Sequence, residues 1–132
     1  MQRRPKQRPT DSELGILKVL WRRGPSTVRE VQAELEKQEP TGYTTVLKLL
    51  QIMTDKQLVE RDESQRAHVY QARHSEQTTQ RRLIGDLLDR AFDGSAAKLV
   101  LQALSTRPTS REEMQEIRRI LDASDETTGE KP

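Results

Sequence analysis

The sequence contains no cysteine and very few aromatic residues. Its 132 residues include one Trp, two Tyr and one Phe. No apolar run approaches the roughly 20 residues that a membrane-spanning helix needs, and the basic start of the chain is not followed by an apolar stretch. The absence of cysteine excludes disulfides, thiolate catalysis and Cys-ligated zinc or copper sites. We therefore expect a soluble, cytoplasmic protein without membrane insertion.

Side chains suited to catalysis or metal binding are also scarce. The chain has two histidines, His68 and His74, whereas a metal site needs several converging ligands. We expect His68 to be a partly buried strand residue and His74 to lie on the surface. Ser12, Ser95 and Ser110 are explained as helix caps or first-turn residues, and no histidine is placed to activate them. The sequence thus predicts no enzyme, no cofactor and no metal.

Charge is unevenly distributed along the chain. Residues 1–73 carry 14 Lys/Arg and 10 Asp/Glu, a net charge of +4, whereas residues 74–132 carry 9 and 11, a net charge of −2. A basic first half that begins with a basic arm suits nucleic-acid binding, and a mildly acidic second half suits contact with protein. The apolar content of 32% is low for a compact monomer, which suggests that part of the core is shared with another chain.

The helix signals begin close to the start of the chain. Thr10 and Glu13 form a predicted capping box before a first helix, which Gly24-Pro25 ends. Ser26 or Thr27 is expected to cap a second helix. Both helices carry apolar residues at helical spacing, so each should bury one side.

A third helix is expected over residues 43–56, and two strand-like runs follow at 58–62 and 67–72. Residues 63–66 form a polar turn between the strands. Three helices followed by a β-hairpin are the layout of a winged helix-turn-helix domain. In that layout the third helix enters the DNA major groove, and the hairpin, or wing, lies over the adjacent backbone.

The outer side of the third helix carries residue types that contact DNA. Thr44, Thr45, Lys48 and Gln51 lie at spacings of one, three and four residues, so they share one surface near the helix start. Lys suits phosphate or guanine, Gln suits adenine, and Thr suits phosphate or a thymine methyl. Arg66, at the tip of the wing, is a candidate for a phosphate or minor-groove contact. These five residues form the predicted DNA-binding site; an ordinary solvated face is the alternative.

Three amphipathic helices are predicted after the wing. A unit this short with so few aromatics cannot bury their apolar stripes alone, but the same segment of a second chain would bury them. A two-fold dimer would also place two reading heads on one face of DNA. We predict a dimerisation module; packing of these helices on their own head is the alternative. The predicted dimer residues are Leu83, Ile84, Leu87, Leu88, Phe92, Leu99, Val100, Leu104, Ile117 and Leu121.

The expected fold class is mainly α. A flexible basic arm (1–8) precedes a winged-helix part (9–74), which we call the head. A helical dimerisation part (75–123), which we call the tail, and a flexible polar end (124–132) complete the chain.

Five segments, in order, carry a family resemblance: PTDSELGILKVLW, STVREVQAEL, GYTTVLKLLQIMTDKQLVER, RAHVYQAR and LLDRAFDGSAAKLVLQAL. Together they resemble the BlaI/MecI family of penicillinase-type transcriptional repressors over about residues 9–123. The resemblance implies a homodimeric winged-helix repressor that binds a palindromic operator in double-stranded DNA through the third helix and the wing residues around Arg66. It also implies a membrane metallopeptidase sensor as a partner.

The sequence departs from the family pattern at three places. Gln65-Arg66 stands where the wing turn usually has Gly-Arg, and Ala72 stands where a proline is common. Gln102-Ala103 stands where the antibiotic-resistance members have the Asn-Phe bond that is cut on derepression. Without cysteine, the chain also lacks the Cys-rich C-terminus through which the copper-responsive relatives bind metal.

Two hypotheses of function remain. The first is a sequence-specific DNA-binding repressor that acts as a homodimer on a palindromic operator. The alternative is a helical interaction adaptor whose winged head binds protein rather than DNA.

Overall fold

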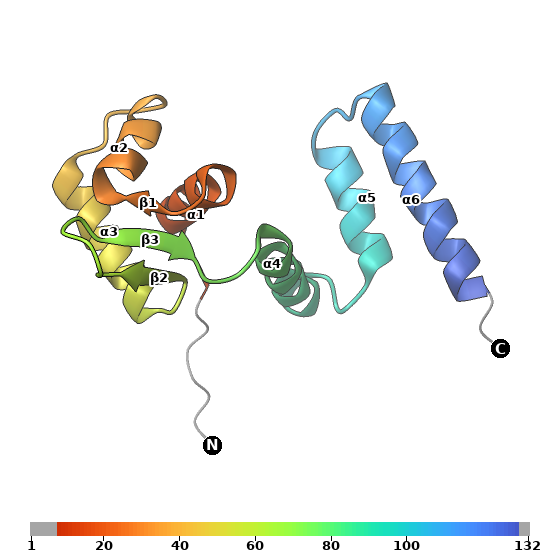
Figure 1. Cartoon of the computed structure of the whole chain (residues 1–132). Helices are drawn as coiled ribbons and strands as arrows, with labels where there is room; N and C mark the ends of the chain where they lie inside the picture. The colour runs from red at the N-terminus through yellow and green to blue at the C-terminus, as the bar shows by residue number, and fades with distance from the viewer. Residues whose placement is uncertain (1–7, 130–132) are drawn as a thin grey trace, which may run out of the picture. The chain divides into compact units, whose positions relative to one another are not determined.

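The computed structural model describes residues 8–129, with side chains to residue 126. Most of the expected basic arm therefore lies outside the described residues. Contacts divide the chain within the fourth helix, between Gly85 and Asp86. Figure 1 shows the elements: α1 (Asp11–Arg23), β1 (Ser26–Thr27), α2 (Val28–Glu36), α3 (Tyr43–Asp55), β2 (Val59–Asp62), β3 (Val69–Ala72), α4 (Glu76–Ala91), α5 (Ala96–Thr106) and α6 (Arg111–Gly129).

Complete capping boxes begin α1 and α2. The Thr10 hydroxyl accepts a hydrogen bond from the Glu13 amide at 3.2 Å, and the Glu13 carboxylate accepts one from the Thr10 amide at 2.9 Å. Thr27 and Glu30 repeat this arrangement, so Thr27, and not Ser26, caps α2. Gly24 ends α1 with a φ of 93°, a left-handed conformation that favours glycine.

The hairpin belongs to a three-stranded antiparallel sheet in the order β1-β3-β2. β1 was not predicted, because a two-residue strand is too short to show a period. Its first residue, Ser26, is fully buried and pairs with Tyr70. The Ser26 hydroxyl accepts a hydrogen bond from Arg23 Nε at 3.0 Å and donates one to the Gly24 carbonyl at 2.8 Å. These bonds fix the turn between α1 and α2.

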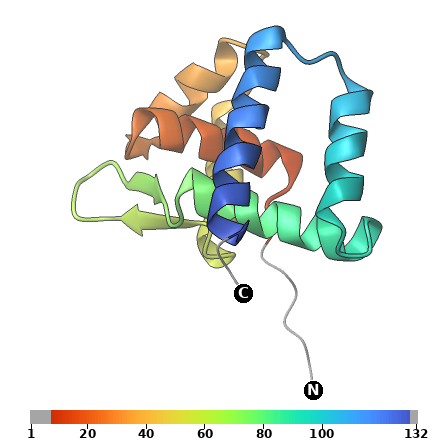
Figure 2. The same cartoon turned by 90° about the vertical axis from the view of Figure 1, so that its right-hand side faces the viewer.

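One hydrophobic core lies between the three head helices and the sheet. Figures 1 and 2 show α1, α2 and α3 grouped with the sheet, and the β2–β3 loop projecting from the head. The side chains of this core are at most 7% exposed, and no buried side-chain nitrogen or oxygen among the described residues lacks a hydrogen bond. The core residues are Ile16, Leu17, Val19, Leu20, Val28, Val31, Val46, Leu50, Met53, Leu58, Val59 and Tyr70.

The two histidines are placed the opposite way from the prediction. His68 is exposed and precedes β3, because the strand begins only at Val69. His74 is half-buried, and its backbone carbonyl accepts a hydrogen bond from Trp21 Nε1 at 2.9 Å. Burial lowers the pKa of His74, and the positive charges of Arg82 and Arg73 lower it further.

The tail consists of three helices whose starts follow the predicted caps. The Ser95 hydroxyl accepts from the Lys98 amide at 3.1 Å, and the Ser110 hydroxyl accepts from the Glu113 amide at 3.0 Å. The last helix, α6, continues to Gly129, past residue 124 at which a polar end was expected. No proline or glycine interrupts residues 111–128, so polarity alone did not end the helix.

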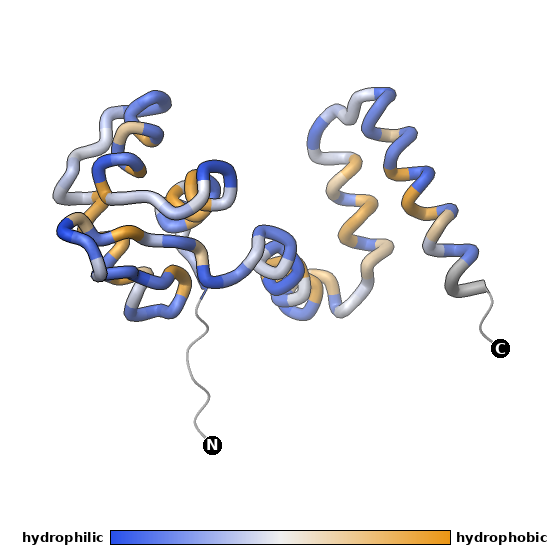
Figure 3. Tube along the Cα trace, viewed as in Figure 1, coloured by the Kyte–Doolittle hydropathy of each residue, from blue (hydrophilic) through white to orange (hydrophobic). Residues whose placement is uncertain are grey.

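No described residue of α4, α5 or α6 is buried. Figure 3 shows hydrophobic positions recurring along α5 and α6. Among the predicted dimer residues, Ile84, Leu87, Val100 and Leu121 are exposed. The others (Leu83, Leu88, Phe92, Leu99, Leu104 and Ile117) are half-buried. Leu101 and Ile120, which were not among those residues, are exposed as well.

Candidate nucleic-acid interface

The core fixes which side of α3 faces outward. Val46, Leu50 and Met53 are fully buried on one side of this helix. Thr44, Thr45, Lys48 and Gln51 are all exposed on the rest of the helix surface; we call these four residues the recognition face. None of the four takes part in a side-chain hydrogen bond or ion pair with another described residue. Their donors and acceptors are therefore available to a partner.

An ion pair anchors the far end of α3 to the start of α1. Lys56, which caps α3, places its Nζ 2.8 Å from Glu13 Oε1. The Glu13 side chain is only 3% exposed, and it serves the Thr10 capping box as well. A buried carboxylate without this partner would be costly. The pair therefore helps to hold α3 in place.

The loop that leads into α3 is held by side chains of α2. Glu36 Oε2 accepts a hydrogen bond from the Thr41 amide at 2.8 Å, and Gln32 Nε2 donates one to the Thr41 carbonyl at 3.1 Å. These two bonds join the last turns of α2 to the residue before Gly42, the N-cap of α3. The orientation of the recognition face thus depends on side chains of the preceding helix.

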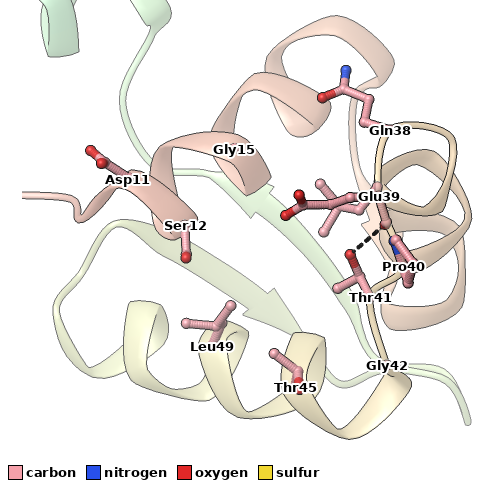
Figure 4. Close-up of a pocket in the computed structure, with 11 residues that line it drawn as sticks. Asp11, Ser12, Gly15, Gln38, Glu39, Pro40, Thr41, Gly42, Thr45 and Leu49 are labelled. Carbon is pink, nitrogen blue, oxygen red and sulfur yellow. Dashed lines mark hydrogen bonds between the residues drawn. The ribbon is translucent and has the colours of Figure 1, made fainter.

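A cleft of about 630 Å³ lies beside the recognition face. Figure 4 shows that it is bounded by the start of α1, the loop of residues 38–42 and α3, with Thr45 and Leu49 on its α3 side. The Thr41 hydroxyl donates to the Glu39 carbonyl at 3.0 Å in its wall. Asp11 and Glu39 contribute carboxylates to the cleft, so the recognition face, which reaches the cleft at Thr45, borders negative charge on this side.

The wing forms a regular hairpin despite its departures from the family pattern. β2 and β3 pair from Val59↔Ala72 to Asp62↔Val69, so Ala72 extends the ladder that a proline would interrupt. In the turn, the Ser64 amide donates to Asp62 Oδ1 at 2.9 Å, and this bond lowers the pKa of Asp62. The turn forms with Gln65 in place of the usual glycine.

Arg66 is exposed at the tip of this hairpin and has no ion-pair or hydrogen-bond partner among the described residues. The neighbouring Arg61 is different, because its Nε lies 2.7 Å from Glu63 Oε2. A hydrogen bond with Tyr70 raises the pKa of Arg61, and the charge of Glu63 adds to this effect. The contacts of Arg61 thus stabilise the wing, whereas the Arg66 guanidinium is available to a ligand.

Three further residues at this surface were missed. Ile52 and Tyr43 of α3 are each 38% exposed, which is unusual for large apolar side chains in the head. The Arg29 guanidinium carbon of α2 lies 4.8 Å from the centroid of the Tyr43 ring. Ile52 follows Lys48 by four residues, a spacing that could have placed it on the recognition face. No sequence signal pairs Arg29 with Tyr43.

The described residues offer no alternative site for metal chemistry. They contain no group of three or more His, Asp or Glu residues placed to hold a metal ion. No helix in the described part of the chain is long and apolar enough to cross a membrane.

A helical head with a three-stranded sheet and an exposed third helix, followed by a helical tail, defines a winged-helix protein. Comparison with known families identifies the family to which this protein belongs. A family model described as "Penicillinase repressor" matches residues 9–123, and the chain belongs to this family. It is a family of transcriptional repressors and not of enzymes. This confirms the prediction of a transcriptional repressor and the prediction that the protein is not an enzyme.

Two curated relatives agree with this assignment. Both are named "Transcriptional regulator BlaI", one from Mycobacterium tuberculosis strain CDC 1551 / Oshkosh and the other from strain ATCC 25618 / H37Rv. Each is 31% identical to this chain over 123 residues, which cover 92% of this chain and 88% of the relative.

Proposed function

We propose that this repressor binds a palindromic operator in double-stranded DNA as a homodimer. The observation that carries the proposal is the recognition face of α3, where Lys48, Gln51 and the two threonines are exposed and have no partner among the described residues. The core on the opposite side of α3 holds this face outward. Arg66 adds a second available cation on the wing.

The residues of the site divide by chemistry. Lys48 and Arg66 carry positive charge suited to phosphates, which position a protein on any duplex. Gln51 and Thr45 suit base edges, which distinguish one sequence from another. A helix in the major groove and a wing over the backbone would use both groups at once.

Selection of genomic fragments tests the proposal directly. The purified protein would be incubated with sheared genomic DNA, and the DNA retained at moderate salt would be sequenced. We expect a recurring palindrome upstream of a few genes, with half-sites about 34–36 Å apart. Uniform recovery of fragments, or none, would contradict specific operator binding.

Variants then separate the two groups of contacts. Gln51→Ala or Thr45→Ala should reduce the preference for the selected palindrome over a random duplex by about tenfold, because each lost base contact costs about 1–3 kcal/mol. Lys48→Ala or Arg66→Ala should weaken binding to both duplexes and reduce the salt slope by about one. Arg118→Ala is the control, since Arg118 is exposed in α6 and has no partner among the described residues.

The homodimer is supported by the apolar surface of the tail. Ile84, Leu87, Leu101, Ile120 and Leu121 are between 44% and 61% exposed. Because about half of each side chain is already covered, burying the rest against a second copy would stabilise the assembly by about 1 kcal/mol for each one. Light scattering should give twice the chain mass of 15.2 kDa. A mass of one chain at micromolar concentration would contradict the homodimer.

The adaptor hypothesis has no supporting observation in the structure. The departures at Gln65 and Ala72 would favour it if they weakened the wing, whereas β2 and β3 pair along their full length. A tight protein partner together with DNA binding that does not depend on salt would restore it.

For the end of repression, we propose the membrane metallopeptidase sensor that the family resemblance implies. Gln102 and Ala103 are exposed on α5, at the position that matches the cleavage site. Mass spectrometry of the protein from induced cells should detect a fragment that ends at residue 102. Intact protein under induction would contradict cleavage at this bond.

A further inference from the structure

Arg29 and Tyr43 form a contact at the edge of the recognition face. Arg29 lies in the first turn of α2, and its guanidinium carbon is 4.8 Å from the centroid of the Tyr43 ring. Tyr43 is the first residue of α3 and directly precedes Thr44. Both side chains are exposed. A cation placed over an aromatic face at this distance is attracted to the ring, even at an exposed site.

The guanidinium of Arg29 has no anionic partner among the described residues, and this distinguishes it from Arg22 and Arg23, the arginines that precede it in the head. Arg22 pairs with Glu34 at 3.3 Å, and Arg23 pairs with Glu30 at 3.0 Å. Arg29 is exposed, and within the described part of the chain its guanidinium contacts only the Tyr43 ring.

The acid closest to Arg29 in sequence is already occupied. One oxygen of Glu30 accepts the Thr27 amide at 2.9 Å, and the other pairs with Arg23. The Thr27 amide and the charge of Arg23 both lower the pKa of Glu30, so this carboxylate stays ionised and engaged. Arg29 is thus a cation held by a ring while its five N–H donors remain unused.

We propose that Arg29 binds a DNA phosphate beside the recognition face, with Tyr43 as its positioning residue. A guanidinium that contacts a ring through its face keeps its N–H edges free, and those edges match a phosphate bidentately. A side chain restrained before binding loses less conformational freedom when the contact forms. The contact carries no sequence information, because every base pair presents the same phosphates.

This inference rests on the proposed function, and a random-sequence duplex is sufficient to test it. The dissociation constant of the full chain for a random duplex of about 30 base pairs would be measured across a series of salt concentrations. Arg29→Gln should weaken binding about tenfold at moderate salt and reduce the salt slope by about one. Arg118→Gln, which removes an exposed arginine from α6, should leave both values unchanged. Circular dichroism would confirm that each variant is folded.

Substitutions of Tyr43 test the positioning role. Tyr43→Leu keeps the charge of Arg29 but removes the ring, so binding should weaken about threefold while the salt slope stays close to that of the unchanged protein. Tyr43→Phe retains a ring and should restore binding. If Tyr43→Phe binds as weakly as Tyr43→Leu, the ring does not position Arg29 and that role is wrong.

The outcomes separate this inference from the proposed function. If Lys48→Ala reduces binding and the salt slope but Arg29→Gln matches the unchanged protein, only the role of Arg29 is overturned. If the unchanged protein shows no salt-dependent binding to any duplex, DNA binding fails and the role of Arg29 fails with it.

Discussion

The head and the tail differ in where their apolar side chains go. Leu50 in α3 is fully buried, whereas Leu101 in α5 is 61% exposed. The head encloses a core of aliphatic residues, one methionine and one tyrosine, but no described residue of the tail helices is buried. At about 25 cal/mol per Å² of apolar surface, the head gains its stability from its own chain. In the proposed dimer, the exposed apolar side chains of the tail would gain a similar burial free energy from the second copy.

The polar contacts show the same difference. In the head they join residues far apart in sequence, as between Trp21 and His74 and between Glu13 and Lys56. In the tail, bonds such as those from Ser105 to Leu101 and from Arg90 to Asp86 stay within one helical turn. Local bonds support each helix without fixing one helix against another. Under the proposed function, the head would therefore act as the DNA-reading unit and the tail as the surface for assembly.

The largest expected effect is on the assembly of the tail. Leu87→Asp places two like charges at the proposed interface, and the dimer dissociation constant should rise about a thousandfold or more, which corresponds to about 4 kcal/mol. Light scattering should then give 15.2 kDa, the mass of one chain. Asp89→Asn, at an exposed position of the same helix, should remain dimeric. An unchanged dimer in Leu87→Asp would show that α4 lies outside the interface.

A leucine truncation in each region sharpens the comparison. Leu50→Ala removes a fully buried side chain and should lower the free energy of unfolding by about 3 kcal/mol, whatever the protein concentration. Trp21, the single tryptophan, lies in the head and reports its unfolding in urea by fluorescence. Leu101→Ala should leave this transition of the head within about 0.5 kcal/mol. Equal losses of unfolding free energy in the two variants would contradict the difference between a buried core in the head and an exposed apolar surface in the tail.

The head and its recognition face could be predicted because their signals are local. Thr10 with Glu13 and Thr27 with Glu30 lie three residues apart, so the sequence shows both capping boxes directly. The buried positions Val46, Leu50 and Met53 recur at helical spacing, and this period determines which residues of α3 point outward.

The features that were missed depend on residues distant in sequence. Ser26 becomes a strand residue only because Tyr70 pairs with it. His74 is half-buried where its carbonyl meets Trp21, and the contact of Arg29 with Tyr43 requires α2 and α3 to be packed first. The spacing of apolar residues and the capping motifs cannot reveal such pairs, because these signals do not describe how one helix or strand packs against another.

A third, smaller effect compares the two capping-box glutamates of the head. Glu13→Gln removes the charge that faces Lys56 at 2.8 Å and should lower the free energy of unfolding by about 2 kcal/mol. Glu30→Gln acts at an exposed position and should cost about 0.5 kcal/mol. Urea unfolding at pH 7 measures both. A double-mutant cycle with Lys56→Met should show a coupling energy for Glu13 and none for Glu30.

The smallest expected effect is the pH dependence of the head. The pKa of His74 is lowered from its usual 6.5, mainly by burial, so the unfolded chain binds a proton before the folded chain does. Stability is therefore complete above about pH 6.5, falls as the pH decreases toward the folded pKa, and levels off below it. Urea unfolding between about pH 7 and pH 5 isolates this group, because carboxylates with lowered pKa values, such as Asp62, titrate at lower pH.

Two histidine variants assign the titration to its residue. His74→Gln should abolish the loss of stability between pH 7 and about pH 5, because it removes the ring and leaves the backbone carbonyl that Trp21 contacts. His68→Gln should retain the loss, since His68 is exposed. If the loss disappears in His68→Gln and persists in His74→Gln, the titrating group lies on the wing. In that case, the burial of His74 would not be the reason that the stability of the head depends on pH.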